Sequence, residues 1–489
     1  MPCRGTKYKP LSIGGEYIVV KDLVPRIHFY DQDFVDMYDR VWIWLDDLWH
    51  PGDKDGAFPE GYYTYGDSNV ISLFDTCLSC LFLAYSNQRY SADSMIDFFY
   101  SVQGPDGQIA EKYDVASRQP VFDDDNPKGA TLPLLSYVEF TFYHKIGNKK
   151  RLKEALPHLE SYFSWVQSNF LQPNGLYTVP YAATHMGDLP REGAVYTVDY
   201  NAMIAVFALY MSYIGEILND KELSFRYMRT YFSVKTRINS MMWDNEDGFY
   251  YDLDGDGKII KNKHIGAYWT LLAKIPNEDY SLRLIDKLRD DKEFGTENPF
   301  PSVPVSSKYF NENGDGYRCG VVPFFTYLVV KGLMNYEAFV FARECSIRHM
   351  YFILDTLNPD EERQGDVWEI YKPGSEGPAA AAGGNKKRYL PMIGLVAVTL
   401  VIENIIGLEI SLPRKTVLWT MQSLEEMGIE GLSLKKNNIT ILSNKNVRGW
   451  EIRLESEKLY YFTIQVLEEE KKKTLPIPSG KCSMFIDKL

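Results

Sequence analysis

The sequence of 489 residues has little cysteine, little histidine and no cluster of basic residues, and each shortage excludes a class of protein. Six cysteines and seven histidines are present, and Cys77-x-x-Cys80 has no second Cys or His pair at zinc spacing, so a structural zinc site is not expected. The 53 Lys and Arg against 66 Asp and Glu give a net charge of −13, without a basic block. Nucleic acid, whose phosphates require clustered Lys and Arg, is therefore not expected as a partner.

No long apolar run stands at the start of the chain or near its end. The first ten residues, MPCRGTKYKP, contain no apolar run of signal-peptide length. The stretch Leu395–Ile406 is interrupted by Glu403 and Asn404 and is too short to span a bilayer. We therefore expect a soluble protein without a membrane span, either cytoplasmic or the mature form of a periplasmic or secreted one. No Gly-rich loop stands at a strand-to-helix turn, so no phosphate-binding or redox cofactor is expected.

Apolar and aromatic residues are abundant. Hydrophobic residues make up 45% of the chain, which excludes a disordered protein. The 35 Tyr, 26 Phe and 9 Trp amount to 14% of all residues. Aromatic rings stack on the apolar faces of sugars, so this composition is typical of a carbohydrate site, although a large aromatic core explains it better when composition is taken alone.

The hydrophobic pattern predicts a ring of helical hairpins. Apolar residues recur at helical spacing in about twelve segments: 33–48, 68–86, 91–103, 129–146, 150–169, 196–218, 220–241, 264–274, 278–289, 320–334, 336–355 and 386–406. Short connections alternate with long ones that are rich in Gly, Pro, Asp and Tyr. In such a ring the tight turns lie on one rim, and the long loops form a site on the other.

The pattern changes near residue 409, where apolar and polar residues begin to alternate at strand period. We therefore predict three parts. Residues 1–30 are an N-terminal extension, residues 31–408 a mainly α-helical (α/α)6 toroid, and residues 409–489 a small, β-sandwich-like antiparallel domain.

Several motifs, in this order, resemble those of one enzyme family. LFDTCLSCLFLAY at 73–85, DGQIAEKYD at 106–114, SMMWDNEDGFYYDLDGDGK at 240–258, DGYRCGVVPFFTYLVVKGL at 315–333 and GDVWEIYKP at 365–373 carry the likeness. They resemble the six-hairpin glycosidases of the trehalase and glycoside hydrolase family 63 group, especially mannosylglycerate-hydrolase-like members. Each motif is weak alone, but their joint order over roughly 65–410 is specific.

The resemblance implies roles for individual residues. Glu369 matches the catalytic base, which activates water. Asp75 matches an aspartate that binds sugar hydroxyls in the pocket for the nonreducing end. Arg318 matches an arginine near the catalytic carboxylates, where its charge would help keep Glu369 ionised. Cys319 stands where the family usually has Gly, a departure that can reshape the pocket.

The position of the catalytic acid departs from the family pattern. Members carry Asp-Asn-Ser-Pro-Arg or Asp-Asp-x-Pro-Arg, with the proton donor three residues before Pro. Here the string is Gly187-Asp188-Leu189-Pro190-Arg191, so strict register places Gly187 at the donor position. We take Asp188 as the acid after a one-residue adjustment of the loop, with Glu192 or Asp123 as alternatives. An acid needs a raised pKa, so we expect Asp188 in the drier environment.

Other candidates lie in the same loops. We predict that Trp368, beside Glu369, stacks on a sugar, and that Tyr371 bounds the pocket or packs under its loop. Arg191 and His185 are further substrate-binding candidates. His185 either orients the acid loop or is an exposed histidine without a role.

A calcium-binding loop is a further possibility. Asp252, Asp254 and Asp256, followed by Gly257, have the alternate spacing of the first half of a calcium loop. Position twelve is Lys263 rather than a bidentate Glu, and a plain Asp- and Gly-rich turn is the alternative.

The most consistent function is hydrolysis of an α-linked glucoside or mannoside by an exo-acting, inverting glycosidase. A non-catalytic sugar-binding protein on the same fold is the main alternative, because Gly187 leaves the acid in question. A sugar epimerase or isomerase is less favoured, since it would need two histidines facing the sugar ring.

Overall fold

The structure of the protein is a computed structural model that describes residues 23–54, 56–64, 69–357, 366–381, 384–434, 437–447, 449–468, 471–477 and 480–487. Helices predominate as far as residue 405, and strands follow from Leu408. Of the predicted N-terminal extension, residues 1–22 lie outside the described residues.

The inner helices of the described chain form a closed ring. They are α3 (Leu73–Leu83), α5 (Leu135–Ile146), α7 (Val198–Leu218), α9 (Trp269–Leu272), α12 (Pro323–Asn335), and α14 (Leu390–Gly394) continued by the π-helical η3 (Leu395–Ile405). Each contacts the next in this order, and η3 contacts α3, which closes the ring.

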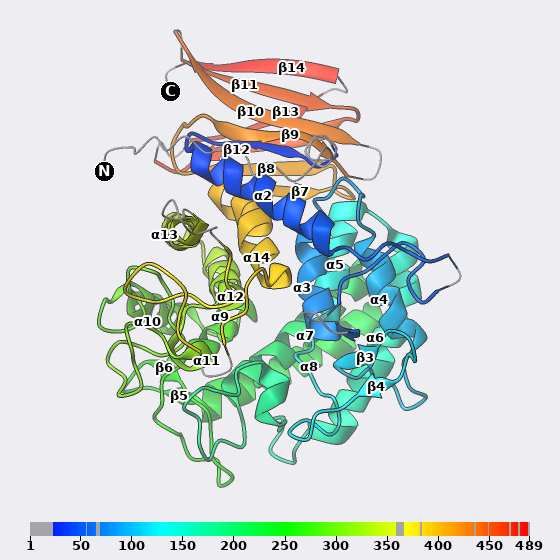
Figure 1. Cartoon of the computed structure of the whole chain (residues 1–489), viewed down its shortest axis with the longest axis vertical. Helices are drawn as coiled ribbons and strands as arrows, with labels where there is room; N and C mark the ends of the chain where they lie inside the picture. The colour runs from blue at the N-terminus through cyan, green and yellow to red at the C-terminus, as the bar shows by residue number, and fades with distance from the viewer. Residues whose placement is uncertain are drawn as a thin grey trace.

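A second set of helices surrounds the ring, and each of them precedes one inner helix in the chain. They are α2 (Gln32–Leu48), α4 (Ala92–Ser101), α6 (Lys149–Phe170), α8 (Lys221–Met241), α10 (Glu278–Arg289) and α13 (Phe339–Leu357). The short helices η1 (Tyr181–Thr184), η2 (Ile265–Tyr268) and α11 (Gly316–Cys319) lie in the connections. This arrangement confirms the predicted (α/α)6 toroid (Figure 1).

The two helix sets differ in sequence because they differ in surroundings. All eleven residues of the inner helix α3 are buried, so it is apolar on every side. The outer helix α8 buries one stripe at spacings of three and four, namely Leu223, Tyr227, Tyr231, Val234 and Ile238. Among the described helices, only α7 is long and apolar enough to cross a membrane by length and composition, and 72% of its most apolar window is buried inside the structure.

Some inner helices are shorter or more irregular than predicted. The segment expected to be helical over 264–274 is a turn of 3₁₀ helix followed by the four-residue α9. The last predicted helix becomes π-helical over Leu395–Ile405, where nearly every side chain is buried. The predicted helix 129–146 begins at Leu135, because residues 129–134 still belong to the connecting loop.

Two sheets follow the toroid. The first has the order β1 (Arg26–His28), β9 (Met427–Ser433), β10 (Asn438–Asn446), β11 (Gly449–Ser456) and β14 (Gly480–Asp487), all antiparallel. The second has the order β13 (Lys471–Ile477), β12 (Tyr460–Val466), β8 (Thr416–Met421) and β7 (Leu408–Ser411). The β8–β12 pair is parallel, which the predicted antiparallel pattern did not include. β1 is contributed by the N-terminal segment, with Ile27 opposite Ile429.

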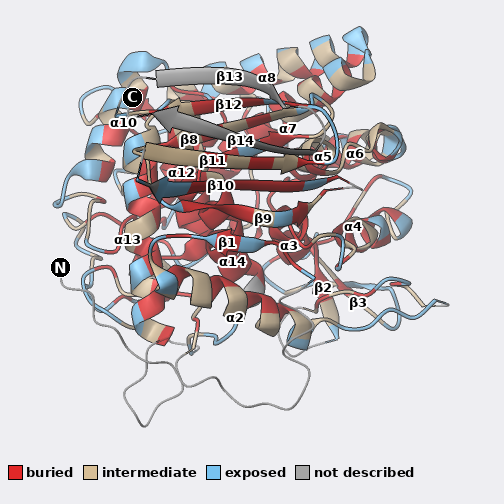
Figure 2. Cartoon of the chain, turned by 90° about the horizontal axis from the view of Figure 1, so that it is seen from above, coloured by how far each residue is buried: buried red, intermediate tan, exposed pale blue. Residues whose placement is uncertain are grey.

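The sheets cover the C-terminal ends of the inner helices. At the end of α5, the ring of His144 lies 2.8 Å from the Ser411 hydroxyl, and the Leu412 amide donates to the His144 carbonyl. After α3, the Asn87 side chain bonds the backbone of Gly431 and Ser433. The sheets thus lie over one end of the ring, and buried residues are concentrated in β9, β10 and the helices beneath them (Figures 1 and 2).

A buried charge network lies at the same end of the ring. Glu403 of η3 accepts from Lys145 at 2.9 Å and from Lys331 at 2.8 Å, and its first oxygen also accepts from the Tyr85 hydroxyl. These side chains come from three inner helices and the end of α3, so the network joins helices that are far apart in the sequence.

Candidate functional site

Most of the predicted site residues lie in loops at the rim opposite the sheets. Each outer helix is antiparallel to the inner helix that follows it. The inner helices are therefore parallel to one another, and their N-terminal ends lie at the same rim. The loops entering α3, α7, α9, α12 and α14 carry the predicted residues. Two small sheets support these loops: β2 (Val70–Ser72), β3 (Lys112–Asp114) and β4 (Pro120–Val121), and the hairpin of β5 (Trp243–Asp244) and β6 (Phe249–Tyr250).

Glu369 is buried at this rim, with a hydroxyl donor and a more distant ammonium group at one of its oxygens. Its side chain is about 6% exposed, its Oε1 accepts from the Tyr317 hydroxyl, and the Nζ of Lys386 lies 3.8 Å from the same oxygen. The Glu369 amide donates to the Lys386 carbonyl at 2.9 Å, which fixes the two segments side by side. The predicted neighbour, Arg318, is not among the residues that bond the carboxylate in the described structure.

Asp75 lies at the start of α3 and has one oxygen without a partner. Its Oδ2 accepts from the Tyr389 hydroxyl at 2.8 Å, whereas the buried Oδ1 has no hydrogen-bond partner in the described structure. Burial and the charge of Glu369 raise the pKa of Asp75 to about 6, against the opposing effects of Tyr389 and Lys386. An unsatisfied buried acceptor beside a second carboxylate is the arrangement expected where a ligand hydroxyl binds.

Glu111 is a member of the same site that the sequence did not single out. It lies in the rim loop before β3, and its Oε2 accepts from the side chain of Asn126 at 3.2 Å. Burial and the charges of Asp75 and Asp123 raise its pKa to about 7, while Lys112 and Asn126 act in the opposite direction. The only sequence feature that pointed to Glu111 was the motif DGQIAEKYD. Its burial was not expected, because an acidic residue in a loop is usually exposed.

His185 is only partly exposed, with about 16% of its side chain accessible. Its ring stacks on Phe74 with centroids 3.6 Å apart, and its Nε2 lies 2.8 Å from the Thr131 hydroxyl. Burial lowers the pKa of His185 to about 3, so the ring is neutral at physiological pH. His185 therefore anchors the loop that leads to Asp188 against the start of α3, and the alternative of an exposed histidine without a role is wrong.

The Asp188 loop projects into solvent. Met186 and Leu189 are buried and fix its two sides, while Gly187 and Asp188 at the tip are exposed. The expectation that Asp188 occupies the drier environment is therefore wrong for this structure, in which Glu369 is the buried carboxylate. The Nε of Arg318 donates to the Asp188 carbonyl at 3.3 Å. The neighbours Tyr317 and Arg318 thus contact Glu369 and the Asp188 loop, respectively.

Arg191 is a core residue and does not reach the rim. Its guanidinium is about 1% exposed and pairs with Asp199 at 3.0 Å and with Asp252 at 3.1 Å. A third contact, at 3.2 Å, joins it to the ring of His264. Arg191 therefore cannot bind substrate in this structure, because buried carboxylates occupy its donors.

The predicted calcium loop is not formed. Asp252 is buried and bonds Arg191, His264 and the Val198 amide. Asp254 instead accepts from the amides of Asp256 and Lys258, as in an Asx-type turn. Within the described residues, no group of three His, Cys, Asp or Glu side chains is arranged to hold a metal ion. The alternate Asp spacing thus reflects a turn and a core ion pair.

The two aromatic candidates beside Glu369 differ in position. Tyr371 is fully buried, and its hydroxyl accepts from the Trp368 amide at 2.9 Å, so it packs under its loop and does not bound the pocket. Trp368 remains partly exposed, and the Nζ of Lys387 lies 5.0 Å from its ring centroid. Trp368 is thus accessible at the rim for stacking on a sugar ring.

Cys319, the other departure from the family pattern, is buried, and its thiol donates to the Asn311 carbonyl.

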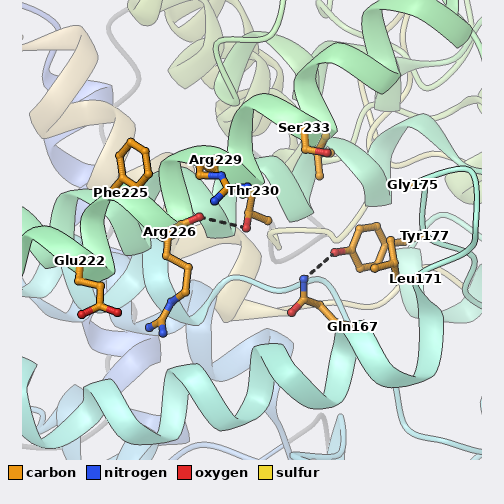
Figure 3. Close-up of a pocket in the computed structure, with 11 residues that line it drawn as sticks. Gln167, Leu171, Gly175, Tyr177, Glu222, Phe225, Arg226, Arg229, Thr230 and Ser233 are labelled. Atoms are coloured by element: carbon orange, nitrogen blue, oxygen red, sulfur yellow. Dashed lines mark hydrogen bonds between the residues drawn. The ribbon is translucent and has the colours of Figure 1, made fainter.

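The structure also contains a pocket on the outer surface. It has a volume of about 590 Å³ and lies between α6 and α8, with Gln167, Tyr177, Phe225 and Arg226 among its lining residues (Figure 3). The residues that line it include none of the predicted catalytic or substrate-binding residues. This pocket is therefore separate from the candidate site.

Comparisons with known proteins agree with this architecture. The family described as the mannosylglycerate hydrolase MGH1-like glycoside hydrolase domain matches residues 182–382, and the family described as the trehalase C-terminal domain matches residues 407–489. An uncharacterized protein of Borreliella burgdorferi is 45% identical over 478 residues, which cover 96% of this chain and 100% of that protein.

Solved structures show the same fold at low sequence identity. The family 63 mannosylglycerate hydrolase of Thermus thermophilus, in complex with glucose, is 17% identical with a TM-score of 0.60, over 74% of this chain and 99% of that one. Neutral trehalase Nth1 from Saccharomyces cerevisiae is 14% identical with a TM-score of 0.53, over 72% of this chain and 76% of that one.

A ring of helical hairpins with buried carboxylates at one rim, matched by a glycoside hydrolase domain, defines a glycosidase. Residues 182–382 are a mannosylglycerate hydrolase MGH1-like glycoside hydrolase domain and residues 407–489 a trehalase C-terminal domain, on the fold of the six-hairpin (α/α)6 glycosidases.

Proposed function

We propose that the protein is an exo-acting glycosidase that hydrolyses an α-linked glucoside or mannoside with inversion at the anomeric carbon. Glu369 acts as the base that deprotonates the attacking water, and Asp188 acts as the acid that protonates the departing oxygen. Asp75 binds hydroxyls of the terminal sugar through its free Oδ1. Long loops around the rim favour a closed pocket over an open groove.

One observation carries the assignment of the two catalytic carboxylates. Tyr317 donates to Glu369, and the next residue, Arg318, donates to the carbonyl of Asp188. Through these two contacts the dipeptide connects the proposed base with the loop of the proposed acid. An inverting enzyme needs its two carboxyl groups roughly 6.5–9.5 Å apart, so that water fits between the base and the sugar.

The epimerase alternative lacks support in the described residues. Such an enzyme would need two histidines facing a sugar ring. His185 stacks on Phe74, and His264 is bound by Arg191 and Asp252. Both rings are therefore committed to protein partners.

The experiment is product release from α- and β-linked gluco-, manno-, galacto- and rhamno-disaccharides by the wild-type protein and by Asp188→Asn. We expect turnover of an α-glucoside or α-mannoside, and a loss of about 10²–10⁴-fold in kcat for the variant with sugar binding retained. Unchanged turnover in Asp188→Asn would assign the proton donor to another residue. Turnover of β-linked substrates alone would refute the proposed linkage.

A further inference from the structure

Within the described residues, two buried carboxyl groups differ from the others in having no ion pair with Lys or Arg within 4 Å. Six acidic residues are buried in the described part of the chain. Four of them lie within 4 Å of a Lys or Arg side chain: Glu139 near Arg151, Asp199 and Asp252 near Arg191, and Glu369 near Lys386. Asp75 and Glu111 have only neutral donors, the Tyr389 hydroxyl and the Asn126 amide. Burying a carboxylate without a cation is costly, so these two carboxyls are exceptions that require an explanation.

The backbone places these two residues side by side. The amide of Leu73, the first residue of α3, donates to the Glu111 carbonyl at 2.7 Å, and Ser72 pairs with Lys112 between β2 and β3. Glu111 is therefore fixed at the N-terminal end of the helix that carries Asp75. The charge of Asp75 contributes to the raised pKa of Glu111, which agrees with this placement.

The hydrogen bonds of Asn126 determine which oxygen of Glu111 carries a proton. Asn126 Oδ1 accepts from the Ala130 amide at 3.0 Å, and its Nδ2 donates to the Ala130 carbonyl at 2.8 Å. Because Ala130 fixes the orientation of the side-chain amide, the Nδ2 faces Glu111 Oε2 at 3.2 Å as a donor. Oε2 therefore accepts, and the proton of the neutral carboxyl resides on Oε1.

The titratable side chains around Glu111 do not supply a positive charge next to Oε1. The nearest, His185 Nε2, lies 3.9 Å away in a ring that burial keeps neutral. The Nζ of Lys112 pairs with Asp123 at 2.5 Å. Burial is the largest effect against ionisation of Glu111; Lys112 favours ionisation, and the carboxylates of Asp75 and Asp123 oppose it. The neutral carboxyl is thus the form that these surroundings favour below pH 7.

We propose that Glu111 is a further substrate-binding residue, whose protonated carboxyl donates a hydrogen bond from Oε1 to a hydroxyl of the terminal sugar. Asp75 Oδ1 accepts from a neighbouring hydroxyl, so the pair presents one donor and one acceptor to adjacent positions of an α-glucoside or α-mannoside. The inference rests on the proposed function for the place of the sugar. Ionisation of Glu111 removes the donor and sets two carboxylates against the sugar, so binding weakens as the pH rises through the pKa of Glu111.

Titration calorimetry with methyl α-D-mannopyranoside and methyl α-D-glucopyranoside at pH 6 and pH 8.5 tests the proposal without requiring turnover. The variants are Glu111→Gln, which keeps a donor at every pH, and Glu111→Ala, which removes it. Glu222→Gln, which removes an exposed charge on α8, is the matched control. Each titration is repeated in two buffers of different ionisation enthalpy, so that the number of protons taken up with the sugar is measured.

For the wild-type protein and the Glu222→Gln control we expect about 30-fold weaker binding at pH 8.5 than at pH 6, because only the protonated fraction binds. At pH 8.5 close to one proton is taken up with the sugar. Glu111→Gln does not lose affinity at pH 8.5 and takes up no proton there, and Glu111→Ala binds weakly at both pH values.

Equal wild-type affinity at both pH values overturns the proposal, as does weak binding by Glu111→Gln or the absence of binding of both glycosides. A Glu111→Gln variant that binds normally but no longer hydrolyses also overturns it, because the proton would then be transferred rather than shared. Binding that follows the expected pattern in a protein without hydrolytic activity refutes the proposed function and leaves the role of Glu111 supported.

Discussion

Replacing Glu111 by Gln is expected to stabilise the folded protein, and to do so more strongly at high pH. The folded-state pKa of Glu111 is about 7, against 4.5 for the free side chain. A carboxyl with a raised folded pKa imposes no cost below its unfolded pKa and destabilises the fold as the pH rises toward the folded pKa. Gln has nearly the same shape and does not ionise.

The magnitude follows from that shift. Integrated over the two pKa values, ionisation of Glu111 costs the folded state about 3 kcal/mol at pH 8 and about 1 kcal/mol at pH 5. A chain of 489 residues unfolds with an entropy of about 1 kcal/mol/K. Glu111→Gln should therefore raise Tm by roughly 3 °C at pH 8 and roughly 1 °C at pH 5.

Scanning calorimetry of the wild type, Glu111→Gln and the exposed control Glu222→Gln at both pH values measures this difference. The control should change Tm equally little at the two pH values, since its side chain is exposed. A Glu111→Gln variant that is destabilised at pH 8, or equally affected at both pH values, would refute the reasoning, because Glu111 would then be a stabilising carboxylate.

Three further predictions concern the core and the acid loop. Burial favours the neutral form of Glu403, but Lys145 and Lys331 outweigh this effect and hold its pKa below 4.5. Glu403→Gln should therefore lower the free energy of unfolding by about 3–5 kcal/mol at pH 7, as measured by thermal unfolding. The loss should become smaller as the pH falls below 4.5. Arg191→Met leaves Asp199 and Asp252 buried without their guanidinium and should also cost about 3–5 kcal/mol, whereas exposed Arg229→Met should cost less than about 0.5 kcal/mol; equal effects would mean that the buried network contributes nothing. A Cβ at Gly187 would meet no atom closer than 3.9 Å, so the structure has room for Gly187→Asp. In the Asp188→Asn background this second substitution should restore less than about a tenth of the wild-type turnover, because Arg318 fixes the register of the loop. Full restoration would place the donor at residue 187.

The fold could be predicted because its signal is local. Inner helices such as α3 are apolar on every side, outer helices such as α8 carry one apolar stripe, and the long loops fall between them in a fixed alternation. The π-helical course of η3 could not be predicted, since it depends on packing inside the ring. The parallel β8–β12 pair also follows from tertiary arrangement, because the strands alternate in the same way whichever neighbour they take.

The site was only partly predictable from the sequence. Glu369 and Asp75 stand in recognisable motifs, and both lie at the rim. Arg191 and Asp252 are 61 residues apart, so their ion pair in the core could not be read from either motif. Glu111 is buried because β2 pairs with β3 and because Asn126, fifteen residues later, faces it. Such long-range desolvation leaves no local pattern in the sequence.

The measurement that tests the central claim most directly is proton NMR of the first product formed from an α-glucosyl or α-mannosyl disaccharide. The wild-type protein should release the β-anomer first, and Glu369→Gln should release no sugar although it still binds the substrate. Initial release of the α-anomer, or turnover by Glu369→Gln at the wild-type rate, would contradict the account, because Glu369 would then not be the base of an inverting hydrolysis.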